Sequence, residues 1–327
     1  MKSRIIYGPI LSRRLGRSLG IDVIRKPGVK KNCNFDCVYC QLGHVGTKIS
    51  YKGEIEGLVT PGEVVEGIRS YHRNIEDLDY ITFSGTCEPT LNPGLGEMIR
   101  GIRKISEHPI CVLTNSSLVS FEHVRLNLAE ADLVVATLVS GYEETFESIN
   151  RPAAGIGLES IINGLKAIMC MEKRPRLGIE VMLLDSSTGY PVNSTDREIA
   201  RLIEVIKTID PDEIEILTVS RPPAEDFVLP VPDVRLKEIA RRFDEEFGRD
   251  RVKLVLQGLK KKSSSMKHDN VEEEVYDLIL RRPCTFSQIG ASLGIRDEEL
   301  NPIIEKLMFS NSIVTIGSKS GRYYRAI

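Results

Sequence analysis

Residues 32–40 read NCNFDCVYC and carry cysteines at Cys33, Cys37 and Cys40. A loop with these gaps can offer three thiols to three corners of a cubane iron–sulfur cluster and leave the fourth iron open. Thiolates suit zinc as well. Structural zinc, however, normally takes four protein ligands, and no fourth cysteine or paired histidine follows at finger-like spacing. His44 is the one nearby candidate for a zinc ligand.

The other four cysteines do not indicate a disulfide framework. The total of seven is odd and the chain is long, so metal or redox chemistry fits better than disulfide bonding. Cys111, Cys170 and Cys284 lie in apolar or helical contexts, and we expect them to be ordinary buried cysteines.

Around this loop, short apolar runs alternate with helical patterns from Leu19 to Gly258. This alternation is typical of βαβ units and a parallel sheet. Most of the runs are continuous in Val, Ile and Leu, as expected for strands covered on both faces. Six strands are predicted: LGIDVI from Leu19, DYITFSG from Asp79, PICVLTN from Pro109, ADLVVATL from Ala131, RLGIEVMLL from Arg176 and EIEILTV from Glu213. RVKLVLQ from Arg251 is a seventh candidate, and helices are predicted over 93–106, 159–171, 196–209 and 233–247.

Beyond residue 258 the pattern breaks at a basic, serine-rich stretch, which predicts a main domain over 1–258 and an exposed linker over 259–270. A second domain is predicted over 271–327. Its signals are one apolar helix face, a short helix after Thr285, a third helix capped by Asp297, and a hairpin turning at Ser320 and Gly321. Three short helices and a hairpin are typical of a winged helix.

Composition is ordinary for a globular protein, with 41% hydrophobic and 28% charged residues in 327. No apolar run approaches the length of a membrane-spanning helix, and the first residues lack the features of a signal peptide, so we expect a cytoplasmic protein without a membrane partner.

Charge is uneven along the chain. The net charge is −2, but residues 2–31 hold nine Lys or Arg residues against Asp22 alone. Such a segment can attract a phosphate-bearing substrate such as nucleic acid, or it can be a solvated surface.

Polar residues follow the predicted strand ends, where barrel enzymes build their active sites. They occur in FSGTCEPTL, in Asn115-Ser116-Ser117, from Thr137 to Ser140, and in RPPAE from Arg221 to Glu225. Arg151 in ESINRP can pair with a carboxylate or phosphate. Glu180 lies in an apolar run and must be paired or functional if it points into the barrel.

The spacing Cys-x3-Cys-x2-Cys, with Tyr39 just before the last cysteine, resembles the defining motif of the radical S-adenosylmethionine (SAM) superfamily. The resemblance implies a partial (β/α)6 TIM-like barrel, with a [4Fe-4S] cluster on Cys33, Cys37 and Cys40. The open iron would bind the amino and carboxylate groups of SAM, and one electron from the reduced cluster would yield methionine and a 5′-deoxyadenosyl radical. The catalytic residues beyond these cofactors are not identified.

The same resemblance implies SAM contacts. Gly85, Thr86, Cys87 and Glu88 match the turn that binds the SAM amino group, although Cys87 departs from the expected Gly or Ser. Tyr39, Asn115 and Ser140 are the other expected contacts with SAM. Asn115 and Ser140 can instead be helix caps.

GPILSRRLGRSLGID, CNFDCVYCQLG, FSGTCEPTL, INRP and RPPAE together resemble an archaeal and bacterial group of radical SAM proteins related to wyosine tRNA-base synthases. That likeness implies modification of a tRNA or other RNA base. The sequence lacks the flavodoxin-like domain of the eukaryotic enzymes, so an external ferredoxin or flavodoxin is the expected electron donor. Two alternatives remain: radical modification of a protein or peptide, and a redox-sensing iron–sulfur regulator that binds DNA.

Overall fold

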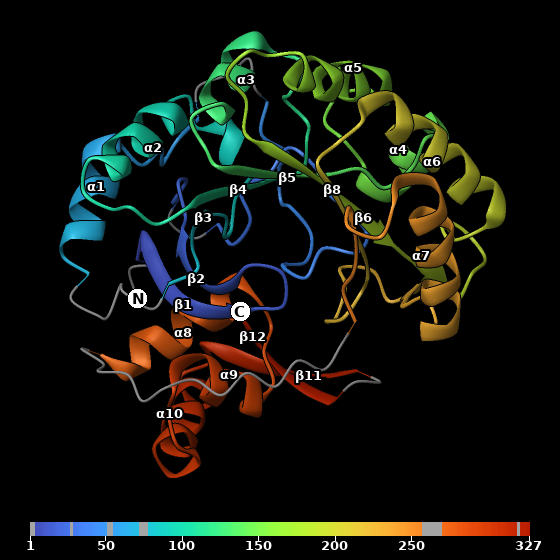
Figure 1. Cartoon of the computed structure of the whole chain (residues 1–327). Coiled ribbons are helices and arrows are strands. Elements are labelled where there is room, and N and C mark those ends of the chain that lie inside the picture. Colours follow the sequence, from blue (N-terminus) through green and yellow to red (C-terminus); the bar gives the residue numbers. More distant parts are fainter. Residues whose placement is uncertain (1–3, 27–28, 51–54, 72–77, 257–269, 319–320) are drawn as a thin grey trace.

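An eight-stranded sheet forms the centre of the structure, a computed structural model that describes residues 4–26, 29–50, 55–71, 78–256, 270–318 and 321–327. Figure 1 shows the sheet as an open arc with the helices along its outer side. In spatial order its strands are β1 (Ile6–Ser12), β2 (Gly16–Ile21), β3 (Tyr80–Phe83), β4 (Ile110–Thr114), β5 (Leu133–Thr137), β6 (Arg176–Leu183), β8 (Glu213–Thr218) and β10 (Val252–Leu254). The outer helices are α1 (Pro61–Arg69), α2 (Leu95–Arg103), α3 (Glu122–Leu128), α4 (Glu143–Asn150), α5 (Leu158–Met169), α6 (Asp196–Ile209) and α7 (Asp233–Phe247).

From β2 to β10 every neighbouring pair is parallel, in the order in which the strands occur along the chain. The six predicted strands and the seventh candidate are therefore confirmed, as is the partial barrel. A short antiparallel pair, β7 (Asp185–Ser186) with β9 (Val228–Leu229), and a 3-10 turn, η1 (Pro89–Leu91), lie in the connections.

Strand β1 was not predicted. It runs antiparallel to β2, with Ile6 opposite Ile21, and extends the sheet by one strand. Gly8 (φ +100°) and Pro9 interrupt its apolar pattern, so the local sequence gives no clear strand signal. Its burial comes from long-range packing, which the local sequence does not show: Ile6 joins the main core, and Ile10 packs against the small core of the C-terminal helices.

The two faces of the sheet have different fillings. Residues that point outward join the main core beneath the helices; Ile81, Val112 and Ile214 are fully buried there. Inside the arc, Leu15 of the β1–β2 turn packs with Cys111, Leu133 and Val135 at the starts of the strands. The turn thereby closes one end of the barrel, as expected for a filled interior.

Helix ends follow capping chemistry. Thr60 begins α1 with a capping box, in which Glu63 N donates to Thr60 Oγ1 (3.2 Å) and Thr60 N donates to Glu63 Oε2 (2.8 Å). Thr285 does the same for α9 (Phe286–Leu293). The predicted Asp297 cap is wrong by one residue: Arg296 is the N-cap of α10 (Asp297–Phe309). Asp297 lies in the first turn, where its negative charge interacts favourably with the helix dipole.

Within the described ranges, no helix has the length and apolar character needed to cross a bilayer.

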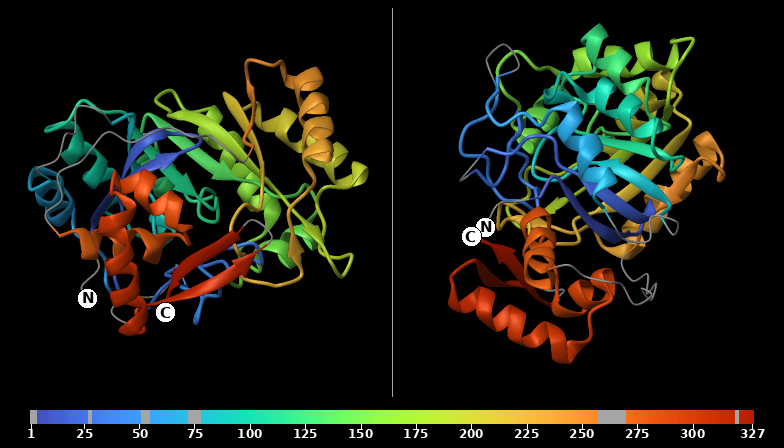
Figure 2. Two further views of the ribbon diagram at one scale, coloured as in Figure 1. Left: turned by 90° about the horizontal axis from the view of Figure 1, so that it is seen from below. Right: turned by 90° about the vertical axis from the view of Figure 1, so that its left-hand side faces the viewer.

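The C-terminal part packs around a core of its own. It comprises α8 (Val271–Arg281), α9, α10 and the antiparallel hairpin β11 (Ile313–Ser318) and β12 (Gly321–Ala326). Val275, Leu278 and Ile279 are buried in this core, as predicted. Figure 2 shows the unit lying against the open side of the arc. The element order is the predicted one, whereas the winged-helix assignment and the domain boundaries stay predictions. Most of the predicted linker (259–269) and Ser320 lie outside the described residues.

Candidate functional site

The cysteine loop, residues 32–43, lies over the carboxyl ends of the first barrel strands and is tied to two other segments. Asn32 N donates to Thr86 O (2.7 Å), and Glu88 N donates to Asn32 O (3.0 Å), which joins the loop to the turn after β3. Val38 N donates to Ile149 O (2.9 Å) at the end of α4. These bonds fix where the three thiols stand.

Amide groups point at the sulfurs. Asn115 Nδ2 lies 3.4 Å from Cys33 Sγ, and Asn150 Nδ2 lies 3.3 Å from Cys37 Sγ. Phe35 N also donates to Cys33 Sγ (3.4 Å). Hydrogen bonds to cysteine sulfur stabilise the negative charge of thiolates and clusters. The loop therefore provides hydrogen-bond donors that stabilise Cys33 and Cys37 as thiolate ligands.

Lys31 adds a buried cation to this set. Its side chain is only 3% exposed, and Nζ donates to Gly43 O (3.1 Å) and lies 3.7 Å from Asp36 Oδ1. Burial lowers its pKa, but Cys40, Cys37 and Cys33 together with Asp36 outweigh burial, so the pKa of Lys31 lies above its ordinary value. A lysine that stays charged here balances anionic thiolates.

Without metal, the thiols of Cys33 and Cys37 are protonated at neutral pH. Burial is the main cause that raises the pKa of Cys37 to about 11, against the opposing charge of Lys31, and burial also raises the pKa of Cys33. Deprotonation would accompany binding of a thiophilic metal centre. No three Cys, His, Asp or Glu side chains among the described residues converge as around one ion. A cubane cluster, whose cysteines bind separate irons, does not need such convergence. The residues present fit a [4Fe-4S] cluster, and the ligand assignment stays a prediction.

His44, the candidate zinc ligand, is turned toward a carboxylate. Its Nδ1 lies 3.1 Å from Asp36 Oδ2, and the ring is half exposed. Asp36 also accepts from Val45 N (2.9 Å). His44 therefore braces the loop end through Asp36.

The turn after β3 holds the predicted SAM-binding residues Gly85, Thr86, Cys87 and Glu88, and it lies beside the loop. Thr86 donates to Asp22 Oδ2 through both N (3.0 Å) and Oγ1 (2.8 Å), so this carboxylate fixes the turn. Burial, followed by the charge of Asp22, raises the pKa of Cys87, so its thiol stays protonated. Gly85 has φ +136°, a conformation that L side chains rarely adopt.

Replacing Gly85 by alanine is expected to lower the free energy of unfolding by about 2–4 kcal/mol, because the new Cβ adds a clash to backbone strain. It would lie 2.7 Å from Asp22 Cγ. Gly189→Ala is the matched control, since Gly189 also has positive φ (+83°) but nothing within 4 Å of the added Cβ. Urea unfolding of both metal-free variants measures the difference. Equal losses would show that contact with Asp22 is irrelevant.

Glu88 and Asn115 connect the ends of β3 and β4. Glu88 Oε1 accepts from Thr90 Oγ1 (2.6 Å) and Thr114 Oγ1 (2.7 Å), and Oε2 accepts from Asn115 N (2.7 Å). Burial raises the pKa of Glu88, and these donors oppose it. Glu88 is thus a brace of the turn with both oxygens engaged. Asn115, in contrast, reaches Cys33 and Asn34 Oδ1 (2.9 Å).

Tyr39 lies between the loop and the barrel interior. Its hydroxyl accepts from Asn150 Nδ2 (3.2 Å). Burial raises its pKa, with Cys37 and Glu180 adding to the effect. Glu180 points inward and is paired: it bonds Arg14 and accepts from Thr137 Oγ1 (3.1 Å).

Ser140 lies away from this group. Its hydroxyl donates to Glu198 Oε2 of α6 (2.7 Å) and accepts from Tyr142 N (2.9 Å), and the residue is buried. The structure therefore shows Ser140 as a brace between β5 and α6, and its SAM contact stays a prediction.

The remaining predicted residues lie at the mouth of the barrel. Arg151 pairs with Glu225, whose N donates to Val38 O (3.1 Å), so both brace the cysteine loop. Arg221 Nη1 donates to Gln41 Oε1 (3.3 Å), next to Cys40.

The other cysteines carry one correction. Cys111 and Cys284 are fully buried, as predicted, but Cys170 is exposed at the C-cap of α5. Helix α5 buries only one face, and Cys170, its C-cap residue, lies on the solvent-exposed side.

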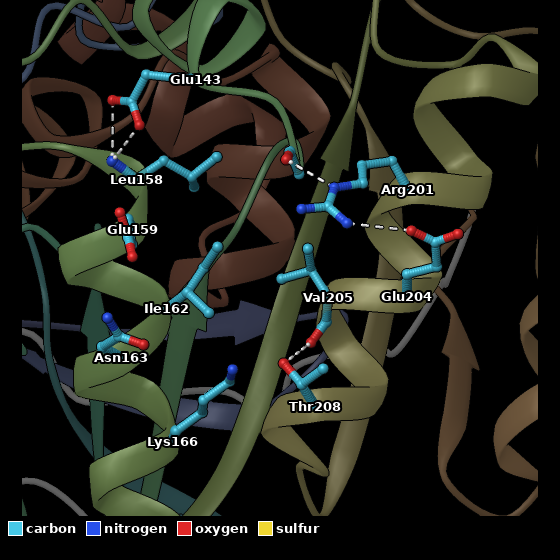
Figure 3. A pocket seen from close by; sticks show the side chains of 11 residues that line it. Glu143, Leu158, Glu159, Ile162, Asn163, Lys166, Arg201, Glu204, Val205 and Thr208 are labelled. Atoms are coloured by element: carbon cyan, nitrogen blue, oxygen red, sulfur yellow. Dashed lines mark hydrogen bonds and ion pairs between the residues drawn. The ribbon is translucent and has the colours of Figure 1, made fainter.

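Two hollows lie elsewhere on the molecule. One, of about 440 Å³, lies between α5 and α6, where Lys166, Arg201 and Glu204 project toward it (Figure 3). The other, of about 370 Å³, lies between α1, β1 and α8. None of the predicted cluster or SAM residues lines either, so the site is defined by its chemistry at the strand ends.

Five residues that support the site were not predicted from the sequence: Lys31, Asn34, Asn150, Asp22 and Arg14. Asn34 lies within the quoted motif and Asn150 directly precedes Arg151, so both carried a positional signal. Asp22 and Arg14 gave none, because their partners are more than sixty residues away.

Comparison with known proteins gives four findings. The Radical SAM superfamily matches residues 29–169. UPF0026 protein MJ1312 of Methanocaldococcus jannaschii is 30% identical over 95% of this chain and 89% of its own length. A protein named GTPase Obg from Brachyspira hyodysenteriae is 28% identical over 96% of this chain, which spans only 44% of that protein. The crystal structure of Streptococcus suis SuiB bound to S-adenosylmethionine is similar in fold, with a TM-score of 0.50 and 14% identity over 70% of this chain and 49% of that one.

Proposed function

Since this chain belongs to the radical SAM superfamily and to the UPF0026 proteins, we propose that it is a radical SAM enzyme whose substrate is a base in RNA. Members of the superfamily bind a [4Fe-4S] cluster and SAM. When bound, these groups supply one-electron cleavage of SAM to methionine and a 5′-deoxyadenosyl radical.

The chain's own residues hold and orient these groups. Cys33, Cys37 and Cys40 would ligate the cluster, with Asn115 and Asn150 donating to the sulfurs and Lys31 balancing the charge. The turn 85–88 would hold the SAM amino group in the position that Asp22 fixes. Arg14, paired with Glu180 and Glu215, fills the interior below and keeps water out of it.

An external one-electron donor, a ferredoxin or flavodoxin, is proposed as the reductant. Cys33 and Cys40 are partly exposed, whereas Cys37 is buried. A cluster held on this loop would therefore lie near the surface, within reach of a docked donor protein.

The observation that favours RNA is the position of uncompensated positive charge. Much of the basic segment is neutralised: Arg4, Arg14, Arg25, Lys26 and Lys31 pair with carboxylates. The predicted basic arm is thus largely a set of ion pairs with distant acids. Arg13 and Lys30 have no such partner in the described part of the chain. Lys30 bonds the C-terminal unit, and Arg13 lies close enough to Arg282 and Tyr323 of that unit for their charges to act on it.

The hairpin of the C-terminal unit also contacts the barrel, in addition to α8 and α9. Lys30 Nζ donates to Ala326 O (3.5 Å), and burial together with Arg325 lowers the pKa of Lys30. Helix α10, in contrast, begins with Asp297, Glu298 and Glu299, which repel phosphate. We therefore propose that RNA contacts the hairpin, while a duplex-DNA recognition role for α10 is disfavoured.

Modification of a protein is the second candidate, and one surface favours it. Phe309, at the end of α10, is 91% exposed, and Met308 and Val314, which are close to it in the sequence, are also exposed. An exposed aromatic beside further apolar side chains is typical of a protein-docking surface. This surface lies on the C-terminal unit and could hold a protein partner or substrate.

We expect the anaerobically reconstituted, dithionite-reduced protein to convert SAM to 5′-deoxyadenosine and to retain an unmodified tRNA transcript at moderate salt. Chromatography measures the nucleoside, and filter binding over a salt series measures retention. Duplex DNA of equal length is the control. Cleavage of SAM without RNA retention would favour the protein substrate. If SAM is not cleaved even when RNA is present, and if the protein binds DNA only when its cluster is loaded, the DNA-binding regulator is favoured.

A further inference from the structure

Three arginines from distant parts of the chain meet where the barrel contacts the C-terminal unit. Arg13 lies in the β1–β2 turn, Arg221 follows β8, and Arg282 is the C-cap of α8. Arg13 Nη2 donates to Ser220 Oγ (2.8 Å), and Arg221 Nε donates to Pro283 O (3.1 Å). Because Ser220 precedes Arg221 and Pro283 follows Arg282, these bonds bring the three residues, the arginine seam, together.

None of the three forms an ion pair with a carboxylate of the described residues. Their partners are neutral: Arg13 also donates to Leu256 O (3.3 Å), Arg221 to Gln41 Oε1 (3.3 Å) and Arg282 to Ser292 Oγ (3.0 Å). Nε of Arg282 is buried without a hydrogen-bond partner. Most other arginines of the barrel have carboxylate partners, so this seam is unusual.

Bringing these groups together without an anion is electrostatically unfavourable. Burial first, and then the charges of Arg282 and Arg13, lower the pKa of Arg221 to about 10. The pKa of Arg13 is lowered as well, first by burial and then by the charges of Arg14 and Arg282. An anion with several oxygens would relieve this repulsion and receive charge-assisted hydrogen bonds.

The seam adjoins the proposed active site. Arg221 reaches Gln41, the residue after Cys40. On the other side of the seam, Tyr323 Oη of the hairpin donates to Ser220 O (3.1 Å). Arg325 lies two residues further along β12, on the same face of the strand as Tyr323. A ligand anchored here would thus lie between the cysteine loop and the hairpin.

We propose that Arg13, Arg221 and Arg282 form a binding site for a phosphate group, placed to anchor a substrate beside the cysteine loop. Phosphate is favoured over carboxylate because its oxygens can receive donors from three directions, whereas a carboxylate is planar. That the phosphate belongs to the substrate rests on the proposed function, whereas the site itself can be tested without SAM chemistry.

Arg282→Gln is the informative change, because it removes one charge and leaves the bonds of Arg13 and Arg221 in place. We expect phosphate to raise the melting temperature of the wild-type full-length chain beyond sodium chloride of equal ionic strength. The variant should bind phosphate at least about tenfold more weakly, and should be as stable as wild type, or more so, in chloride alone. Arg296→Gln is the matched control, since Arg296 is 76% exposed and paired with Glu299; it should respond like wild type.

Filter binding of a short RNA hairpin then identifies the source of the phosphate. Weaker RNA retention by Arg282→Gln assigns it to a polynucleotide. Unchanged RNA retention with a lost phosphate response assigns it to a small phosphorylated molecule. The proposal is overturned if phosphate acts no better than chloride on wild type, or if Arg282→Gln responds fully to phosphate. Arg13→Gln repeats the comparison should Arg282→Gln fold poorly.

Discussion

Alanine at Cys33, Cys37 or Cys40 is expected to reduce SAM cleavage to background and to prevent loading of a stable [4Fe-4S] cluster. Two remaining thiols cannot close the three-point attachment that the loop offers, and no fourth cysteine lies in residues 32–43 to replace the lost one. Cys37→Ala should be the most severe. Cys37 is buried, accepts a hydrogen bond from Asn150, and stands at the centre of the loop.

Iron and sulfide analysis, the absorption spectrum after anaerobic reconstitution, and chromatography of 5′-deoxyadenosine measure these effects. Cys170→Ala is the matched control, because Cys170 is exposed on α5 and has no role in the proposed site; it should load and cleave as wild type does. Normal cleavage by any of the three loop variants would remove that cysteine from the ligand set.

The barrel strands could be predicted from the sequence because the residues of each strand indicate by themselves that the strand is buried. A parallel strand covered on both faces must be apolar at nearly every position, and runs such as Leu133–Thr137 satisfy this without knowledge of any partner. Strand β1 is different. Gly8 and Pro9 interrupt its apolar residues, and part of its burial comes from α8 and α9, far along the chain, which pack on it.

The candidate site divides in the same way. The three cysteines lie within eight residues, so their spacing alone indicates a cluster loop. The groups that support the sulfurs come from elsewhere: Asn115 follows β4, and Asn150 ends α4. An asparagine after a strand or at a helix end is equally a cap, and only the tertiary fold shows which sulfur it faces. Ser140 illustrates the converse, because its strand-end position matched the expected pattern while its hydroxyl is bonded to Glu198.

Arg281→Met is expected to lower the free energy of unfolding of the metal-free chain by about 3–5 kcal/mol, because it leaves buried carboxylates without their cation. Arg281 and Asp22 are each 1% exposed, with Nε 3.4 Å from Asp22 Oδ2. Nη1 lies 2.9 Å from Asp277 Oδ1, and the guanidinium stacks on Tyr7 at 4.2 Å. Since Asp22 also holds Thr86, this one side chain of α8 joins the C-terminal unit to the predicted SAM-binding turn.

Urea unfolding measures the loss, and Arg241→Met is the matched control. Arg241 pairs with Glu245 on the exposed face of α7, and such a pair contributes about 0.5 kcal/mol or less. Adding Asp22→Asn to Arg281→Met should recover part of the stability, since one of the two unpaired charges is then removed. Additive losses in the double variant would show that the two residues are not coupled.

The loss caused by Arg281→Met should shrink as the pH falls. Burial raises the pKa of Asp277 above its unfolded value, and Arg281 is the largest opposing influence. A carboxyl group with a raised pKa contributes stability while it is protonated and loses that contribution as the pH rises through its folded pKa. Without Arg281 this pKa rises further, so Asp277 is protonated over a wider acidic range and the unpaired charge disappears there. Urea unfolding of wild type and of Arg281→Met at several pH values between about 4 and about 8 tests this. If the difference in the free energy of unfolding does not change with pH, the lost packing on Tyr7 causes it and the lost charge does not.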